Sequence, residues 1–450
     1  MKHPLAVAVL SIMLAHAPLA IAQVTEPEKE KPAVQEKPAG NEVPITFSFN
    51  NGLKFKSTDG NVEGAIGGRL YVGYRTILDR FDAAGAAAAV NPGQPPDTDF
   101  IRTARFLYDG TFYKDWYVRV EGEFANTGSF ALKDGYMGWK GCPEFGLRGG
   151  QMKGPFSQEE TCSSRFIDFA DRSLANRLSV GHDLGIQAIG SLFNDILGYE
   201  IGLFNGGATE LKDSGRNTLD LNDEKDFIGR IRITPFKNSD SELLRQLRIG
   251  VAFTHGDQDT NALADITTAM SGTRIIDFGA FNLDGNRTRV GVEFSYHYGP
   301  FSLRAEYLQL KQELIDGLPE NSVTFTATYV QATFLLTGEA KPLENRVKPA
   351  RNFSFKDGGW GAFELALRYA FIEVRDADTA GVLVVTAPFT PNEKCTEITF
   401  GVNWWMTPNV RLTIDFTQYT FGEEMPVSAS GVIDELGSEK LVISRLQIDF

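Results

Sequence analysis

The sequence contains no long apolar run beyond its first residues, and it is poor in cysteine and histidine. Nothing after the N-terminus approaches the roughly 20 consecutive apolar residues of a membrane helix, so helical membrane spans are excluded for the mature protein. The three cysteines, Cys142, Cys162 and Cys395, are too few for a disulfide scaffold and lack the paired spacing of a zinc site. We therefore expect unpaired cysteines, no metal and no cofactor.

Positive charge is also in short supply. The 450 residues include 44 Lys and Arg against 58 Asp and Glu, which gives a net charge of −14. This acidity argues against binding of nucleic acid or of an anionic membrane surface through bulk charge. The chain is long enough for one very large domain or for about three ordinary ones.

The N-terminus has the organisation of a secretory signal peptide, predicted over residues 1–22. Lys2 and His3 form a basic start, residues 5–17 form a short apolar stretch, and residues 20–22 (Ala-Ile-Ala) form a small-x-small cleavage site. We predict cleavage before Gln23 and export from the cytoplasm.

Residues 23–61 are expected to form a short periplasmic extension. Prolines among Glu and Lys predict an unstructured spacer over 23–44. Residues 45–56 alternate around Asn50-Asn51-Gly52, and Asn-Gly supplies the positive φ angles of a type I′ turn, so a small hairpin is predicted there.

From Val62 onward the dominant sequence period is two. In the clearest case Val410, Leu412, Ile414 and Phe416 alternate with polar or charged residues. The same alternation recurs along the chain, with these apolar and charged sets: Val118/Val120 with Arg119/Glu121, Ile231/Ile233 with Arg230/Arg232, Val290/Val292 with Arg289/Glu293, and Leu365/Leu367 with Glu364/Arg368. Alternation over short segments predicts β-strands with one apolar and one charged face.

The spacing of the turns predicts an all-β protein, a transmembrane antiparallel barrel of sixteen strands over residues 62–450. Short turns mostly alternate with long polar connections, and strands joined in this way describe an outer-membrane barrel. Two segments depart from the rule, because 236–246 and 337–359 are long where a short turn is expected. The last strand alternates up to the terminal Phe450, which resembles the assembly signal of outer-membrane barrels.

A closed barrel of this size is too wide for side chains to fill, so an aqueous lumen is predicted. The apolar set must face lipid and the charged set must enclose water. The long segment 153–183 lacks strand periodicity and is expected to fold inward as a constriction loop. On this topology Cys142 and Cys162 lie at opposite ends of one strand, too far apart for a disulfide bond.

Several motifs resemble the phosphate-selective porin O and P family. They occur in order over nearly the whole chain after residue 62, at residues 66–70, 100–105, 113–116, 133–136, 150–157, 171–173, 204–206, 299–302, 305–307, 336–339, 401–404 and 445–447. The resemblance implies a homotrimeric barrel in the outer membrane, contacting its lipid, with the third outer loop folded inward. It also implies lumen-lining roles for Arg69, Arg102 and Arg105, and for Arg165 and Arg172 in the inward loop.

The sequence departs from the family pattern in one place, and this departure concerns which solute the pore selects. Phosphate-selective members carry several arginines in the fifth outer loop, and here the matching stretch 265–274 retains only Arg274. We therefore predict an outer-membrane porin for passive diffusion of small hydrophilic solutes, weakly anion-preferring, with phosphate or similar anions among its solutes. The candidate pore-lining or anion-contacting residues are Arg69, Arg75, Arg102, Arg105, Arg119, Arg148, Lys153, Arg165, Arg172, Arg177, Arg230, Arg232 and Arg274.

Two other classes of protein remain open at this stage. An outer-membrane barrel enzyme would need a Ser/His/Asp-like group, for which His297 near Ser295 and Glu293 is the candidate, although a single wall histidine is more often structural. A secreted β-sheet carbohydrate-binding protein would turn its apolar faces inward. No catalytic residues are predicted.

Overall fold

The computed structural model describes residues 43–78, 97–125, 130–206, 223–262, 266–268, 274–276, 282–313, 322–378, 394–429 and 432–450. The expected signal peptide and most of the proline-rich spacer lie outside these residues, so cleavage before Gln23 stays a prediction.

Antiparallel strands make up most of the described chain. Their bounds are β1 Ile45–Phe49, β2 Leu53–Ser57, β3 Val62–Ile77, β4 Thr98–Phe112, β5 Trp116–Glu123, β6 Ala131–Cys142, β7 Phe145–Lys153, β8 His182–Leu192, β9 Leu197–Phe204, β10 Asp226–Ile233, β11 Arg248–Ala262, β14 Asn282–Tyr298, β15 Phe301–Glu313, β16 Ser322–Leu335, β17 Ala362–Asp378, β18 Lys394–Thr407, β19 Val410–Ala429 and β20 Val432–Asp449. A separate two-stranded sheet is formed by β12 Ile266–Thr267 and β13 Arg274–Ile276.

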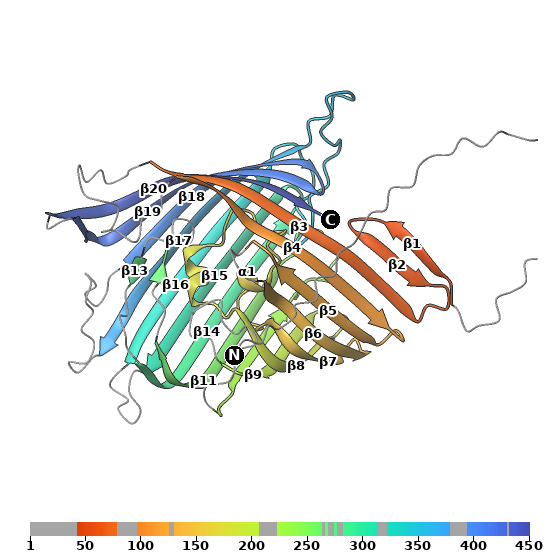
Figure 1. Ribbon diagram of the computed structural model, residues 1–450, viewed down its shortest axis with the longest axis horizontal. Coiled ribbons are helices and arrows are strands. Elements are labelled where there is room, and N and C mark those ends of the chain that lie inside the picture. Colours follow the sequence, from red (N-terminus) through yellow and green to blue (C-terminus); the bar gives the residue numbers. More distant parts are fainter. Residues whose placement is uncertain are drawn as a thin grey trace, which may run out of the picture. The chain divides into compact units, whose positions relative to one another are not determined.

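The large sheet closes on itself between its last and third strands. It has eighteen described strands, of which β1 and β2 form a hairpin beside the barrel and the remaining sixteen form the wall. β20 pairs with β3 from Leu441↔Ile77 to Asp449↔Arg69, and Figure 1 shows the strands lying side by side. Closure pairs the backbone groups that an open edge would leave in hydrocarbon. The predicted sixteen-stranded barrel is therefore confirmed.

The expected hairpin around Asn50-Asn51-Gly52 is present as β1 and β2. Asn51 and Gly52 have φ values of 53° and 119°, the left-handed conformation that this turn requires. β2 pairs with the first part of β3, next to the place where β20 ends, so the hairpin extends the sheet beside the C-terminus (Figure 1).

The two faces of the wall have the polarity that the alternation predicted. Arg230 on β10 is only 2% exposed, whereas its neighbour Ile231 is 40% exposed, and Val120 and Leu446 are exposed in the same way. A soluble sandwich would bury these apolar side chains and expose the arginine. The inside-out arrangement fits a wall between lipid and a polar lumen, and it excludes the secreted carbohydrate-binding alternative.

The short turns lie where they were expected, but some long connections are shorter than predicted. β19 and β20 stay paired out to Ala429↔Val432, and β11 pairs with β14 out to Ala262↔Asn282. The sequence analysis had assigned most of 422–439 and 256–286 to loops. Those strand ends carry no apolar alternation, because a strand that extends past the hydrocarbon has no lipid face to cover.

Between β7 and β8 the chain turns inward, and the α-helix α1 (Gln158–Thr161) and the 3-10 helix η1 (Leu174–Leu178) form there. Leu174 and Leu178 of η1 are fully buried in an apolar cluster with wall residues such as Leu310 and Phe325. The inner face of β15 to β17 is thus partly apolar, which the assignment of all apolar side chains to lipid had missed. Apolar side chains of the inward loop pack against this inner face of the wall.

No helix within the described residues combines the length and the apolar character needed to cross a membrane.

Candidate functional site

The segment 153–183, the inward loop, is held by carboxylates of the wall strands β15, β18 and β19. Glu306 accepts hydrogen bonds from Ser157 Oγ at 2.9 Å and from the backbone N–H of Gln158 at 2.5 Å. Further along, the backbone N–H groups of Leu174 and Ala170 donate to Glu397 at 2.7 Å and to Asp415 at 2.6 Å. These carboxylates therefore satisfy loop amides and stabilise the folded-in conformation.

Arginines of the same part of the wall bind the carbonyl oxygens of the loop. Arg411 donates to the Ile167 carbonyl at 2.8 Å, and Arg368 donates to the Asp171 carbonyl at 3.0 Å. Arg445 donates to the Ala170 carbonyl. These three guanidinium groups, on β17, β19 and β20, thus hold the inward loop against this part of the wall.

The segment 336–361, the periplasmic segment, also folds into the barrel. It joins β16 to β17, and it contains the long connection that broke the turn rule. Lys341 is buried and pairs with Asp168 of the inward loop at 2.6 Å and with Glu364 of β17. Val347 packs in a second apolar cluster with Ala362 and Trp405. The periplasmic segment is longer than the expected short turn because a short turn could not reach the inward loop.

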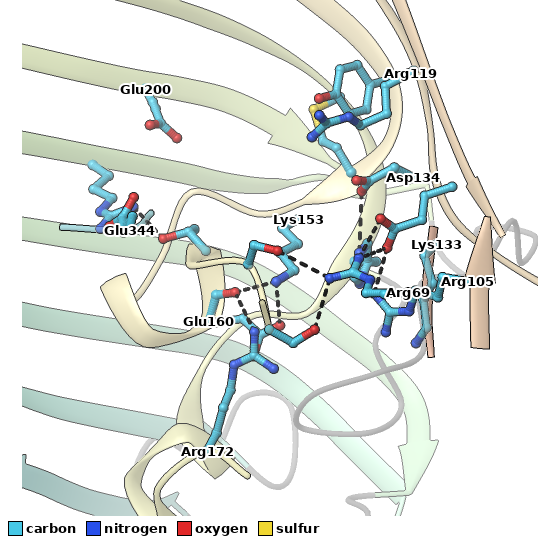
Figure 2. A pocket seen from close by; sticks show the side chains of 18 of the residues that line it. Arg69, Arg105, Arg119, Lys133, Asp134, Lys153, Glu160, Arg172, Glu200 and Glu344 are labelled. Carbon is cyan, nitrogen blue, oxygen red and sulfur yellow. Dashed lines mark hydrogen bonds and ion pairs between the residues drawn. The ribbon is translucent and has the colours of Figure 1, made fainter. Parts of the chain in front are cut away.

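The space left between the inward loop and the strands β3 to β10 forms a cavity of about 390 Å³. Eleven Lys and Arg side chains and six Asp and Glu side chains line it within the described residues. The cations are Arg69, Arg102, Arg105, Arg119, Lys133, Arg148, Lys153, Arg172, Arg177, Arg230 and Arg232, and the acids are Glu121, Asp134, Glu160, Asp171, Glu200 and Glu344. Figure 2 labels ten of these side chains, which come from the wall strands, the inward loop and, for Glu344, the periplasmic segment.

One side of the cavity is built from an arginine and carboxylate network on β3, β4 and β5. Arg69 and Arg105 both donate to Glu121, at 2.5 and 2.6 Å, and Arg105 also pairs with Glu123 at 2.6 Å. Arg69 further reaches Ser163 and Ser164 of the inward loop at 3.2 and 3.0 Å. Such cross-strand pairs fix the guanidinium groups in place while leaving them at the lumen.

The arginines of the other wall strands are paired to different degrees. Arg119 forms a bidentate pair with Asp109, and Arg230 pairs with Glu293 at 2.8 Å. Arg232 is 2.6 Å from Glu200. Arg148 is only within 4.0 Å of that carboxylate and donates to Gln187 at 3.0 Å, so its charge is less neutralised.

The loop side of the cavity contributes further cations. Lys153 and Arg172 lie 3.6 and 3.3 Å from Glu160, and Arg102 of β4 lies 3.3 Å from Asp171. Arg177 donates to the backbone carbonyl of Thr268 at 2.9 Å. The positions of these charged groups therefore depend on the folded-in conformation of the inward loop.

Three of the thirteen candidate residues do not line this cavity. Arg75 is on β3 toward the outer end. Arg165 is in the inward loop, and its Nε and Nη2 atoms are buried without a hydrogen-bond partner among the described residues. The backbone of Arg274 is in β13, and its side chain lies outside the described part of the chain.

Sequence reasoning missed several residues that the cavity includes. Lys133 and Asp134 were quoted as a family motif but were not proposed as site residues, although both line the cavity. His182 Nε2 lies 3.4 Å from Asp134 Oδ1. Glu344 was missed because it is in the periplasmic segment, where no strand alternation indicates which way a side chain points.

Metal-ligating side chains, the cysteines and His297 are the other groups that could carry chemistry. The described residues hold no group of three or more His, Cys, Asp or Glu that could bind a metal ion. All three cysteines are free, as predicted, with Cys142 exposed and Cys162 and Cys395 buried. His297 is buried and neither ring nitrogen has a hydrogen-bond partner among the described residues, so it is not hydrogen-bonded to Ser295 or Glu293.

Comparison with known proteins gives a consistent result. The family model of the phosphate-selective porins O and P matches residues 81–426. Porin O of Pseudomonas aeruginosa is 26% identical over 407 residues, which cover 83% of this chain and 86% of that protein.

Two solved structures share the fold at low sequence identity. The outer membrane channel DcaP of Acinetobacter baumannii is 12% identical, with a TM-score of 0.53 over 88% of this chain and 99% of that one. OmpT, an outer membrane protein of Vibrio cholerae solved in a trimer form, is 11% identical, with a TM-score of 0.52 over 87% of this chain and 100% of that one.

Proposed function

The chain belongs to the phosphate-selective porin O and P family and is an outer-membrane porin for passive diffusion, and we propose that its lumen prefers small anions weakly over cations. The solutes are small and hydrophilic, with phosphate or similar anions among them. The proposal concerns selectivity and the residues that produce it.

The charge of the cavity carries this proposal. Its lining has five more cations than acids in a chain whose net charge is −14. Fixed positive charge in a narrow aqueous lumen attracts anions and repels cations. The preference is weak because four of the six carboxylates are in ion pairs with these cations, so that much of the charge is neutralised locally.

Arg148 and Arg177 are the best candidates for direct contact with a passing anion. Arg148 is 4.0 Å from its nearest paired carboxylate, and Arg177 donates to a backbone carbonyl. Both therefore retain donors for a solute oxygen, whereas Arg119 and Arg230 use theirs in bidentate pairs with Asp109 and Glu293.

Reversal potentials in planar bilayers under a potassium chloride gradient test the proposal. We expect a permeability ratio modestly in favour of chloride, and a clear cation preference would overturn it. Adding phosphate and pyrophosphate during single-channel recording then tests for a binding site, which would produce block at low concentration.

The assembly and the absence of catalysis belong to the same proposal. We infer a homotrimer from family membership, and OmpT of Vibrio cholerae, which shares the fold, was solved in a trimer form. We further infer that the barrel has no catalytic activity, because His297 makes no hydrogen bond that could activate a nucleophile. Native mass spectrometry in detergent and assays with peptide and phospholipid substrates test these two statements.

A further inference from the structure

Glu344 places a carboxylate in the pore from an unexpected direction. It belongs to the periplasmic segment, yet it lines the same cavity as the wall arginines. In Figure 2 it lies on the left of the view, away from Arg69 and Arg105 on the right. Its φ of 48° is a left-handed conformation that costs a non-glycine residue about 1 kcal/mol, so surrounding contacts must hold it there.

Those contacts flank Glu344 on both sides. Lys341 is buried between Asp168 and Glu364, and Arg346 pairs with Asp449 of β20. Val347 is 1% exposed in the apolar cluster with Trp405. The backbone of the segment is therefore fixed just before and just after Glu344, and the carboxylate cannot leave the lumen without breaking buried interactions.

The segment also separates two spaces. Lys341, Pro342 and Leu343 line a second cavity of about 530 Å³, together with residues of the turns that follow β10 and β14. Glu344, the next residue, lines the first cavity instead. Glu344 therefore lies at the edge of the arginine-lined cavity, next to residues that line the second one.

The carboxylate of Glu344 differs from the others in this cavity. Four of the other five form ion pairs with cations, and the fifth, Asp134, lies 3.4 Å from His182, whereas Glu344 makes neither a hydrogen bond nor an ion pair with the residues that the structure describes. Arg304 of β15 and Arg248 of β11 lie near enough for their charges to interact with it. Its half-buried side chain leaves the charge open to whatever passes.

We propose that Glu344 is a specificity-determining residue of the pore, a fixed negative charge that limits how strongly the lumen prefers anions. This rests on the anion-preferring pore proposed above. A unit charge about 8 Å from a passing ion, at an effective dielectric constant between about 40 and 80 and screened by about 0.1 M salt, changes the local concentration of that ion about 1.5- to 2.2-fold. Because the charge acts in opposite directions on anions and cations, the ratio of the two changes by the square of this factor, about two- to fivefold. Removing the charge raises the anion to cation permeability ratio by that factor.

The first experiment measures reversal potentials for the full-length porin and for Glu344→Gln under the same salt gradient. We expect the permeability ratio to rise about two- to fivefold in the variant. Glu144→Gln is the matched control, because Glu144 is an exposed carboxylate at the turn between β6 and β7, outside both cavities. The control should leave the ratio unchanged.

A second measurement changes the charge within one folded channel. Glu344→Cys is made in a Cys142→Ser background, since Cys142 is exposed and the other two cysteines are buried. A methanethiosulfonate reagent that adds a sulfonate should return the ratio toward the unmodified porin, and one that adds trimethylammonium should raise it further.

Different outcomes would overturn the proposed anion preference and the proposed role of Glu344. A cation-selective wild-type porin would overturn the proposed function whatever the variants do. An anion-preferring wild type with the same reversal potential in Glu344→Gln, or with no response of Glu344→Cys to either reagent, would overturn the role of Glu344 alone.

Discussion

Lys341 Nζ lies 2.6 Å from Asp168 Oδ1, although 173 positions separate the two residues in the sequence. This buried pair joins the periplasmic segment to the inward loop, two elements that enter the lumen from opposite ends of the barrel. Gln331 also donates to Asp168, at 2.8 Å, so the loop carboxylate is bound from two sides. The constriction is therefore one connected structure.

Lys341→Met is expected to loosen this structure. It leaves Asp168 and Glu364 buried without their cation, and breaking a buried pair in this way costs about 3–5 kcal/mol. We expect the folded barrel to convert to its unfolded form at a lower temperature in heat-modifiable gel migration, and open-channel current noise to increase. Lys348→Met is the control, since Lys348 is exposed on the same segment. Equal behaviour of the two variants would contradict the pairing.

Arg148→Gln is expected to weaken the anion preference. Its guanidinium is less neutralised than that of Arg232, so its removal subtracts lumen charge and lowers the anion to cation permeability ratio by about twofold. Reversal potentials under a salt gradient measure the change. Arg351→Gln removes an exposed arginine outside the described cavities and should not alter the ratio. If both variants shifted the reversal potential equally, the effect would come from the net charge of the protein and not from the position of Arg148.

Leu178→Ala tests the apolar anchoring of the inward loop. Leu178 is fully buried between η1 and the inner face of β15 to β17. Truncating a buried leucine to alanine costs about 2–5 kcal/mol, and here the cost falls on the loop more than on the barrel hydrogen bonds. We expect larger single-channel conductance with a barrel that still resists cold SDS. Unchanged conductance and noise would show that the loop does not depend on this contact.

The cysteines should differ in reactivity toward a maleimide on the folded protein. Cys142 is exposed, whereas Cys162 is 1% exposed and burial raises the pKa of its thiol, so less of the reactive thiolate forms. Mass spectrometry should find one label per chain before unfolding and three afterwards. Detection of a Cys142–Cys162 disulfide would contradict the described topology.

The mature protein is expected to begin at Gln23. The basic start, the apolar stretch and the Ala-Ile-Ala ending of residues 1–22 are typical of a cleaved signal peptide. Intact-mass measurement on protein purified from outer membranes checks this, and retention of residues 1–22 would show that export uses an uncleaved signal.

Much of the wall could be predicted from the sequence because its cause is local. Each strand must be apolar toward lipid and polar toward water, so Ile231 and Arg230 reveal their faces by position alone. The Asn-Gly turn of the β1–β2 hairpin is a local property of the same kind. The ends of β19 and β20 were missed because lipid no longer imposes alternation there.

Which side chains hold the inward loop and which line the cavity was decided by the tertiary structure. Arg411 and Arg148 look alike in the sequence, yet the first binds a loop carbonyl and the second faces the cavity. That difference arises because Arg411 lies where the inward loop packs against the wall, whereas Arg148 lies beside the space that the loop leaves open. The sequence by itself determined a closed barrel with charges inside. Contacts between residues far apart in the chain, such as Lys341 and Asp168, decided which of those charges hold the constriction and which remain for a solute.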